Sequence, residues 1–489
     1  MCHRHEMEYS MKLYNTLTRT KDEFTTHEPG VCRMYTCGPT VYHFAHIGNL
    51  RSYIMEDVLD KYLRYDGYDV RRVMNITDVG HLSSDADTGE DKMLKGAKRE
   101  KKTVMEIAKF YTDAFFADCA KLNIRTPDVV EPATSCIPEF IQMVEGLLEK
   151  GYAYVAEGNV YFDTSKLQEY YVFNKHDVED LEVGVREGVE EDTAKRNKSD
   201  FVLWFTKSKF DDQELKWDSP WGIGYPGWHI ECSAISLKHL GEYLDLHCGG
   251  IDNAFPHHTN EIAQSEAYIG HKWCPHWFHI LHLNTNSGKM SKSTGEFLTV
   301  SLLESKGYDP LVYRFFCLQS HYRKSLVFSY EGLDNASVAF KKLIDRIAAI
   351  KNEGEVDTYA FSNLKKSFTD ALDNDLNTAL AVTALYDVLK AKVNGATKLA
   401  LIADFDRVLS LSLIEKAEAA KMQKADDAAE SAESGVDGEL KAWIESMITE
   451  RAEAKKAKNY ARADEIRAEL SAKGVTLKDT KEGTTYTIQ

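Results

Sequence analysis

The amino-acid sequence predicts an α/β protein with a parallel sheet, followed by an α-helical bundle and a small α+β unit at the C-terminal end. Three observations support this prediction. A strand, a tight turn and a helix follow one another near the start of the chain. From about residue 341 the apolar residues keep helical spacing. The last segment combines helical stretches with two extended stretches that contain glycine.

The first strand, turn and helix are expected between residues 33 and 63. Arg33–Cys37 is extended in character, and Gly38-Pro39 interrupts it. His46 and Asn49 then lie at the start of the helix, where N–H groups and the helix dipole favour phosphate, and Gly48 lets a ligand approach the backbone. Taken alone, a capped helix start explains this pattern better. The helix itself is predicted from the apolar residues Ile54, Val58, Leu59 and Leu63.

A second segment that suits phosphate is the polar loop Lys289-Met290-Ser291-Lys292-Ser293. Its two ammonium groups could close over a triphosphate and oppose the charge that develops when the α-phosphorus is attacked. Alone, such a stretch is more often a solvated loop. Between the two segments stands Gly249-Gly250-Ile251-Asp252, whose glycines permit close approach and whose carboxylate could bind a ribose hydroxyl. The combination indicates a nucleotide site.

Four further residues are candidate metal ligands: Cys37, Cys232, His257 and Glu261. The last two are four residues apart, so they would project from the same face of a helix. Two thiolates, one imidazole and one carboxylate complete a tetrahedral zinc site. Their spacing is not that of a zinc finger, and taken alone, buried cysteines beside a capped helix explain it better.

These segments resemble the HIGH and KMSKS signatures of class I aminoacyl-tRNA synthetases, with Asn49 in place of the second histidine. An amide still donates a hydrogen bond to phosphate, although it removes a possible cation. The whole pattern is closely similar to the cysteinyl-tRNA synthetase family, specifically over residues 12 to 350 and more loosely to 483. The strings that carry the resemblance are Tyr35–Tyr42, Asn75–Asp78, Pro226–Ser233, Phe255–His258 and Glu261–Ser265.

The resemblance implies a Rossmann-like class I synthetase catalytic domain, an anticodon-binding bundle and one Zn²⁺ per chain. The zinc ligands would be the four candidates above. ATP would bind with Mg²⁺: His46, Gly48 and Asn49 at its phosphates, Lys289 and Lys292 at the departing diphosphate. The resemblance places Gly250 and Asp252 at the ribose, Trp228 in the wall of the amino-acid pocket, and Thr77 and Asp78 near the substrate ammonium.

The activity implied by the resemblance is that of a cysteine–tRNA ligase, which joins L-cysteine to ATP as cysteinyl-adenylate and transfers it to tRNA(Cys). Cysteine differs from serine by one atom, and an apolar pocket separates such substrates by only ~10–200-fold. Binding of the substrate thiolate to zinc would discriminate cysteine from serine more strongly than an apolar pocket does, so no editing domain is expected. Because four protein ligands saturate a tetrahedral ion, the substrate sulfur would add a fifth bond or loosen Glu261.

The chain divides into seven predicted segments. Some rest on composition: the highly charged insertion, the apolar faces of the bundle (Leu343, Ile344, Ile347 and Ile350; Phe368, Leu372, Leu376 and Leu380), and an Ala/Glu/Asp-rich linker. The segments are 12–145 (first half of the catalytic domain), 146–215 (connective insertion), 216–285 (second half), 286–340 (lysine loop and stem-contact region), 341–416 (anticodon-binding bundle), 417–438 (linker) and 439–489 (C-terminal tRNA-binding unit).

Bulk composition agrees with a reduced, cytoplasmic protein that makes no membrane contact, and a monomer is expected. Nine cysteines in a long chain argue against a disulfide framework, and no apolar run approaches a membrane span. A net charge of −17 does not suit RNA, so a local basic face is expected on one long helix. That face would consist of Arg451, Lys455, Lys456, Lys458 and Arg462.

Three departures from the family pattern are Cys136, Cys248 and Tyr486. The two cysteines could touch the nucleotide or be small buried hydrophobes, and Tyr486 could stack on an anticodon base. Alternative functions remain: a cysteine ligase of the mycothiol pathway, which lacks the C-terminal part; a synthetase-like protein that only binds RNA or zinc; and a simple nucleotidyltransferase, which would not explain the metal ligands.

Overall fold

The computed structural model describes residues 11–79, 92–173, 192–207, 214–285, 288–289, 297–433, 438–457, 459–480 and 483–488. The chain forms two compact units, residues 1–414 and 415–489. The described helices of the first unit are α1 (Ile47–Tyr65), α2 (Lys92–Glu100), α3 (Val104–Lys121), α4 (Ile137–Glu149), α6 (Trp228–Leu240), α7 (His257–Ile269), α8 (Val300–Ser305), α9 (Pro310–Leu318), α10 (Tyr330–Ala348), α11 (Thr358–Asp373), α12 (Thr378–Lys390) and α13 (Gly395–Leu409).

The described strands of this unit form four sheets. Three short 3₁₀ turns join them to the helices: η1 (Ala133–Ser135), η2 (Thr164–Lys166) and η3 (Ile251–Ala254). The strands are β1 (Lys12–Asn15), β2 (Thr20–Glu23), β3 (Val31–Thr36), β4 (Asp69–Ile76), β5 (Val129–Pro132), β6 (Ala153–Ala156), β7 (Asn159–Phe162), β8 (Phe201–Phe205), β9 (Tyr225–Pro226), β10 (Leu246–Gly250), β11 (His276–Ile280), β12 (Leu283–Thr285), β13 (Gly288–Lys289) and β14 (Leu326–Phe328).

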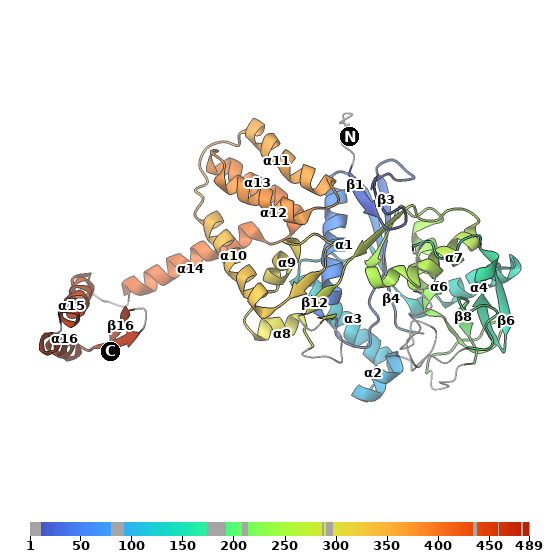
Figure 1. Ribbon diagram of the computed structural model, residues 1–489, viewed down its shortest axis with the longest axis horizontal. Helices are drawn as coiled ribbons and strands as arrows, with labels where there is room; N and C mark the ends of the chain where they lie inside the picture. The colour runs from blue at the N-terminus through green and yellow to red at the C-terminus, as the bar shows by residue number, and fades with distance from the viewer. Residues whose placement is uncertain are drawn as a thin grey trace. The chain divides into compact units, whose positions relative to one another are not determined.

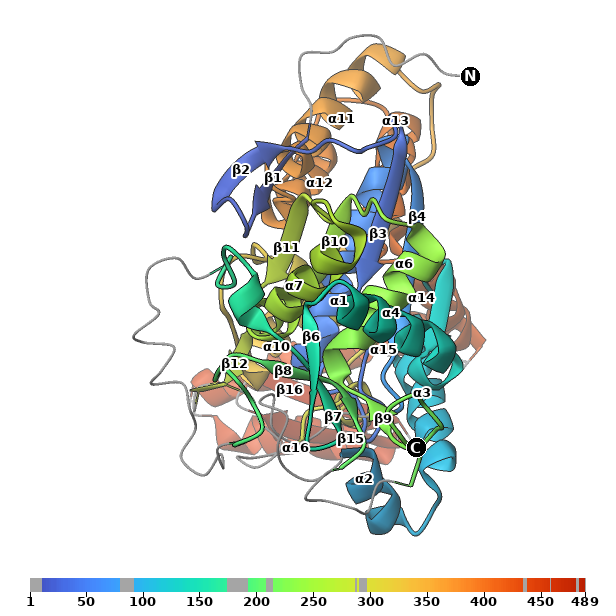
Figure 2. The same ribbon diagram turned by 90° about the vertical axis from the view of Figure 1, so that its right-hand side faces the viewer.

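The central sheet has five parallel strands in the order β11-β10-β3-β4-β5, and Figure 2 shows β11, β10, β3 and β4 side by side. The chain runs outward from β3 through β4 to β5, then returns to the other side of β3 through β10 and β11. The strand order therefore reverses between β3 and β10. In open parallel sheets, ligands bind at the carboxyl ends of the strands at this point. The expected parallel α/β fold is confirmed.

Helices cover both faces of the sheet. Figure 1 shows α1 and α9 on one side, and α6 and α7 on the other. Helix α1 follows β3 as the sequence predicts, and its residues Leu50, Ile54, Val58 and Leu63 are completely buried. The N-cap of α1 is His46, which keeps an extended backbone while its side chain accepts from the backbone amide of Asn49.

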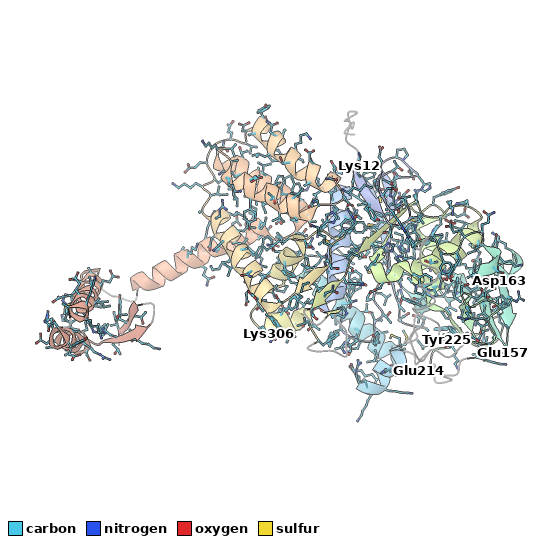
Figure 3. All side chains as sticks on the ribbon, in the orientation of Figure 1. Lys12, Glu157, Asp163, Glu214, Tyr225 and Lys306 are labelled. Atoms are coloured by element: carbon cyan, nitrogen blue, oxygen red, sulfur yellow. The ribbon has the colours of Figure 1, made fainter. Side chains whose placement is uncertain are left out.

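A separate antiparallel sheet, β6-β7-β8-β9, lies within and just after the predicted insertion 146–215. Its strand β8 is buried throughout, including Trp204. Figure 3 labels Glu157, Asp163 and Tyr225 around this sheet. Of the charged stretch expected over 180–200, residues 180–191 lie outside the described residues and 192–200 lead into β8.

The predicted helical bundle comprises α10 to α13, and α11 packs against both α12 and α13. Leu343 and Ile347 of α10 are buried as expected. One expectation is wrong: Phe368, Leu372, Leu376 and Leu380 do not form one helical face. Helix α11 ends at Asp373, and Asn377 caps α12 by accepting from the amide of Leu380 at 3.1 Å. The side chain of Leu380 is consequently 51% exposed.

Helix α14 (Leu413–Glu433) crosses the boundary at residue 414. The predicted linker 417–438 is therefore helical as far as Glu433, since Ala, Glu and Lys are strong helix formers even in a charged, low-complexity stretch. The second unit then contains α15 (Gly438–Lys456), α16 (Tyr460–Ala472), β15 (Val475–Thr480) and β16 (Gly483–Ile488). Its small core consists of Ile444, Met447, Ile466, Leu470, Val475 and Leu477.

The predicted single basic helix over 451–462 is wrong. Helix α15 ends at Lys456, and Asn459 caps α16 by accepting from the amide of Arg462 at 3.2 Å. Arg451 is buried, and Arg462 forms ion pairs with Glu450, Glu465 and Glu469. Lys458 lies outside the described residues. Much of the expected positive face is thus neutralised or hidden.

In the described part of the chain, none of the helices has the length and apolar character needed to cross a lipid bilayer.

Candidate active site and metal centre

A cavity of about 380 Å³ opens at the carboxyl ends of β3 and β10, where the strand order reverses. Segments that are far apart in the sequence converge there: the turn after β3, the start of α1, the end of β10, and α6 with α7. Of the predicted site residues, those that line the cavity are Cys37, His46, Gly48, Asn49, Thr77, Trp228, Cys232, Gly250, Asp252 and His257.

The start of α1 presents an ordered imidazole to this cavity. His46 Nδ1 accepts from the backbone amide of Asn49 at 3.1 Å, so a neutral imidazole carries its proton on Nε2 and can donate there. A side chain at Gly48 would place its Cβ 2.9 Å from His46 Nδ1. Glycine is therefore needed at this position to leave room for the ring.

The end of β10 contributes the predicted ribose-binding group. Asp252 lies in η3, the short turn that begins directly after Gly250. Its carboxylate lies 3.1 Å from His282 Nε2. His282 also lines the cavity, and the sequence offered no signal for it because it follows an ordinary buried strand. The contact with His282 orients a carboxylate that remains 55% exposed and accessible to a ligand.

The four predicted zinc ligands come together although they stand on three separate segments: the turn after β3, α6 and α7. The ligand atoms of Cys37, Cys232, His257 and Glu261 all lie within 4.8 Å of one another, and all four residues are buried. The sulfur atoms are 3.9 Å apart, Cys232 Sγ is 3.4 Å from His257 Nε2, and that nitrogen is 3.0 Å from Glu261 Oε1. Tetrahedral zinc, with bonds of about 2.0–2.3 Å, needs ligand atoms about 3.3–3.8 Å apart. The observed separations of 3.0–3.9 Å bracket this range, so shifts of a few tenths of an ångström would let these four donors hold zinc.

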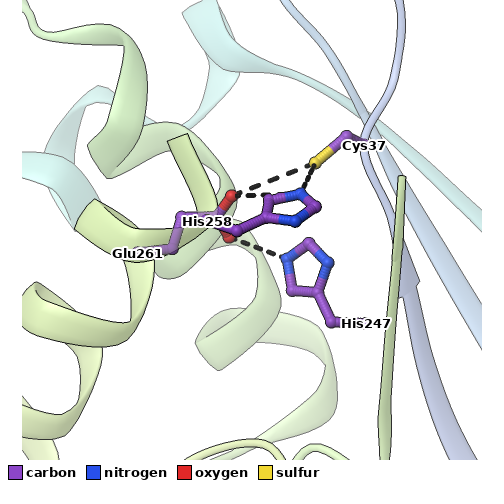
Figure 4. A group of neighbouring side chains, drawn as sticks. All are labelled: Cys37, His247, His258 and Glu261. Atoms are coloured by element: carbon purple, nitrogen blue, oxygen red, sulfur yellow. Dashed lines mark hydrogen bonds and ion pairs between the residues drawn. The ribbon is translucent and has the colours of Figure 1, made fainter. Parts of the chain in front are cut away.

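The structure adds a second, overlapping group that the sequence did not indicate: Cys37, His247, His258 and Glu261 (Figure 4). In it, Cys37 Sγ lies 3.2 Å from His258 Nε2, and His247 Nε2 lies 2.8 Å from Glu261 Oε2. Among the described residues that line the cavity, three belong to the first group and only Cys37 to the second. A metal that must reach a ligand in the cavity is thus better placed in the first group.

Surrounding histidines orient the first group. His229 Nδ1 lies 2.8 Å from His257 Nδ1, which turns His257 Nε2 toward the sulfur of Cys232. His247 holds the second oxygen of Glu261. Such outer contacts fix the orientation of metal ligands and tune their basicity.

Electrostatics prepare these residues for a cation. Burial disfavours the Cys232 thiolate, but the hydrogen bond with Cys37 and the His257 imidazole lower its pKa to about 6. Burial likewise opposes ionisation of Glu261, yet His247 and His257 lower its pKa to about 2. A buried thiolate and carboxylate side by side favour the binding of a divalent cation. Glu261 and Cys232 also raise the pKa of His257 against its burial, so the imidazole holds a proton that a bound metal would displace.

Thr77 and Trp228 border the same cavity. The Thr77 hydroxyl donates to Glu231 Oε2 at 2.8 Å and accepts from Asn75 Nδ2 at 3.0 Å. The Trp228 ring stacks on His257, with centroids 4.0 Å apart. Asp78 does not line the cavity, because its carboxylate accepts instead from the amide and hydroxyl of Thr134.

The lysine loop is described only in part. The backbone of Lys289 lies in β13, paired with Asn284 of β12. Its side chain and residues 290–293, including Lys292, lie outside the described residues. The cysteines that depart from the family pattern are absent from the described cavity lining: Cys136 is buried beside Lys238, and Cys248 is buried within β10.

The cavity wall also contains a buried carboxylate that the sequence did not single out. Glu56 is 1% exposed and lies 3.4 Å from the guanidinium of Arg72. Burial raises its pKa to about 8 against the attraction of Arg72. The only sequence signal was an acidic residue within the apolar stripe of α1.

Comparison with known proteins gives the family. Residues 23–338 match tRNA synthetases class I (C) catalytic domain, residues 367–427 match the DALR domain, and residues 437–486 match the cysteinyl-tRNA ligase anticodon binding domain. The cysteine–tRNA ligase of Treponema denticola is 45% identical over 500 residues, covering 98% of this chain and 99% of the relative. That of Borreliella burgdorferi is 44% identical over 488 residues, covering 97% and 98%.

A solved structure supports the fold. Methionyl-tRNA synthetase of Mycobacterium tuberculosis, in complex with methionyl-adenylate, aligns with a TM-score of 0.51 over 79% of this chain and 90% of that chain. At 16% identity the likeness concerns the fold alone. From the family match and the full-length similarity, the chain belongs to the cysteine–tRNA ligase family of class I tRNA synthetases.

Proposed function

We propose that this chain is a cysteine–tRNA ligase that activates L-cysteine with ATP and transfers it to the 3′ end of tRNA(Cys). One observation carries the proposal: a buried group of two cysteines, a histidine and a glutamate forms part of the cavity that His46 and Asp252 also border. A thiol-selective cation would therefore lie beside a nucleotide site.

Zinc would be held by Cys37, Cys232, His257 and Glu261. When bound, it supplies a bond to the sulfur of cysteine that serine and alanine cannot form. A site that bonds one specific group can discriminate by roughly 10⁴–10⁵, whereas shape alone reaches far less. The side chains around the metal would keep the pocket small, with Trp228 as one wall.

The remaining residues would bind and orient the two substrates. His46 Nε2 donates to the triphosphate at the start of α1, with Gly48 and Asn49 beside it. Asp252 accepts from the ribose hydroxyls above Gly250. Because the Thr77 hydroxyl already donates to Glu231, it can only accept a further bond, which suits an ammonium group.

The first chemical step would be attack of the cysteine carboxylate on the α-phosphorus of ATP, releasing diphosphate. It requires no general base, so positioning and charge stabilisation supply the catalysis. Lys289 and Lys292, with Mg²⁺, would neutralise the departing diphosphate. In the second step a hydroxyl of the terminal adenosine of tRNA displaces AMP. We place this reaction in a cytoplasmic monomer.

The alternative that shares this chemistry is the cysteine ligase that forms an amide with an amino-sugar. It needs no anticodon-reading part. The matches at residues 367–427 and 437–486 support the tRNA ligase instead.

The proposal is tested by ATP–diphosphate exchange with cysteine, serine or alanine, before and after removal of metal by a chelator. We expect exchange with cysteine alone, lost on chelation and restored by added zinc. Equal exchange with serine, or exchange that survives complete metal removal, would contradict the role of zinc. Absence of exchange, with and without tRNA, would favour a protein that only binds RNA or zinc.

A further inference from the structure

A continuous row of aromatic rings leads from the surface of α3 into the cavity. Phe110 on α3 contacts Phe44 at a centroid distance of 6.0 Å, and Phe44 contacts Tyr111 at 5.0 Å. Tyr111 stacks with His43, and His43 contacts Phe297 at 4.4 Å. Phe297 in turn contacts His46, the residue proposed to bind phosphate. The row thus joins the surface to the nucleotide site.

The outer end of this row is exposed. Phe110 is 43% exposed and Phe44, which it contacts, is 39% exposed. A contiguous apolar patch at the rim of a cavity marks a binding surface more often than a scattered exposed residue does.

The same edge is strongly basic, although the chain carries a net charge of −17. Residues 92–109 contain seven lysines and arginines against two glutamates. Lys102 Nζ lies 4.5 Å from the centre of the Phe110 ring. Arg99 donates to the carbonyl of Tyr42 at 3.1 Å and to the Tyr111 hydroxyl at 3.2 Å, which fastens α2 to the cavity rim.

Aromatic faces beside cations are the chemistry that binds single-stranded nucleic acid: bases stack on the rings and phosphates meet the cations. A duplex, whose bases are already stacked, needs only the cations. We propose that this edge, formed by α2, the start of α3 and Phe44, binds the unpaired 3′ end of the tRNA. Phe110 and Phe44 stack its bases, and Lys102 faces its phosphates together with the exposed Lys95 and Lys98 of α2.

The choice of this RNA segment rests on the proposed function. The 3′-terminal adenosine must reach an adenylate inside the cavity, so the nucleotides before it must cross the rim. The row from Phe110 to His46 provides that path. Figures 1 and 2 both show α2 next to α3 in this part of the unit.

The test compares Phe110→Ala with Phe110→Trp and with Tyr243→Ala as a control. Tyr243 is also an exposed aromatic residue, at 49%, but it precedes β10 and so lies at the opposite end of the sheet from the cavity. In Phe110→Ala, cysteine-dependent ATP–diphosphate exchange should stay unchanged while kcat/KM for tRNA falls roughly 5- to 150-fold, the range measured when one base loses its stacking partner. Phe110→Trp and Tyr243→Ala should retain charging.

Binding of tRNA with and without its unpaired 3′ nucleotides locates the contact. The native chain should bind the truncated tRNA more weakly than the complete tRNA. The Phe110→Ala variant should bind both RNAs with the same, weaker affinity. If Phe110→Ala weakens both RNAs equally, or neither, the proposed path is wrong. If exchange with cysteine is absent from the native chain, the proposed function fails, while the binding comparison still decides whether the edge holds a single strand.

Discussion

At the scale of single residues, buried polar groups shape the site more than its apolar lining does. Gly48 leaves room for the His46 ring, and His229 and His247 orient the ligand atoms of His257 and Glu261. Glu56 shows the cost of such placement: its carboxylate is 1% exposed, and its nearest cation among the described residues is the Arg72 guanidinium, 3.4 Å away. Burial of a charge without full pairing favours its neutral form.

Stability should therefore depend on pH through Glu56. Its pKa rises from 4.5 to about 8 on folding, so the folded chain keeps a proton that the unfolded chain has lost. The protonated Glu56 carboxyl therefore contributes on the order of 3–5 kcal/mol to the free energy of unfolding. This stabilisation is complete below about pH 4.5 and is lost as the pH rises through about 8. Glu56→Gln should flatten the pH dependence of the unfolding free energy across this window. Glu145→Gln, at an exposed helical position, should not; identical profiles for the two variants would refute the account.

Zinc content separates the two overlapping ligand groups. Cys232→Ser replaces a thiolate with a hydroxyl, a poor zinc ligand, and should lower both metal affinity and cysteine-dependent exchange by at least about tenfold. His258→Gln removes a candidate ligand that belongs to the second group but not to the first, so this variant should keep its zinc. Metal analysis of the purified variants distinguishes these outcomes. The opposite pattern would assign the metal to Cys37, His247, His258 and Glu261.

At the scale of elements, buried arginines connect helices by donating hydrogen bonds to backbone carbonyls of other segments, including the carbonyls at helix ends. Arg51 of α1 donates to the carbonyls of Leu281 and His282, just before β12. Arg314 of α9 donates to Asp57 of α1 at 2.7 Å and to the carbonyls of Leu122 and Leu409, at the ends of α3 and α13. These contacts hold the bundle against the catalytic sheet within the first unit.

Arg314→Met should destabilise the first unit by about 3–5 kcal/mol, because it leaves the Asp57 carboxylate and two carbonyls without their buried partner. Thermal or urea unfolding measures the effect. Arg407→Ala is the matched control: Arg407 pairs with Asp404 at the surface, with 62% of its side chain exposed, and should cost less than about 1 kcal/mol. A loss below that of the control would show that Arg314 is dispensable.

At the scale of the whole molecule, the chemistry and the anticodon-type domain belong to different compact units. The first contains the cavity and the ligand groups, and the second has its own apolar core. The matched anticodon binding domain, residues 437–486, falls within the second. Adenylate formation should therefore need only the first unit, whereas charging should need both.

A chain ending at Glu433 keeps α14 and removes the second core. ATP–diphosphate exchange should remain within about twofold of the full chain, while kcat/KM for tRNA should fall by more than about tenfold, since contacts at two linked sites reinforce each other. Circular dichroism would verify that the first unit stays folded. Unchanged charging would exclude a role for residues 434–489 in tRNA binding.

The family and the fold class could be predicted from the sequence, because strings of local residues carry the family resemblance. The same resemblance implied the four candidate ligands Cys37, Cys232, His257 and Glu261, which the structure brings together. Asn377 and Asn459 cap the starts of α12 and α16 and thereby interrupt two helices that were expected to be continuous. These caps are local signals too, but the helix-forming composition around them outweighed them in the prediction.

Only the tertiary structure revealed the second histidine group, the Asp252–His282 pair, buried Glu56 and the aromatic and basic edge at α3. Each depends on side chains from distant segments that meet where the order of the parallel strands reverses. Periodicity and spacing encode which residues share an element, but they carry no record of which elements become neighbours. That information lies in the packing of the sheet and its helices.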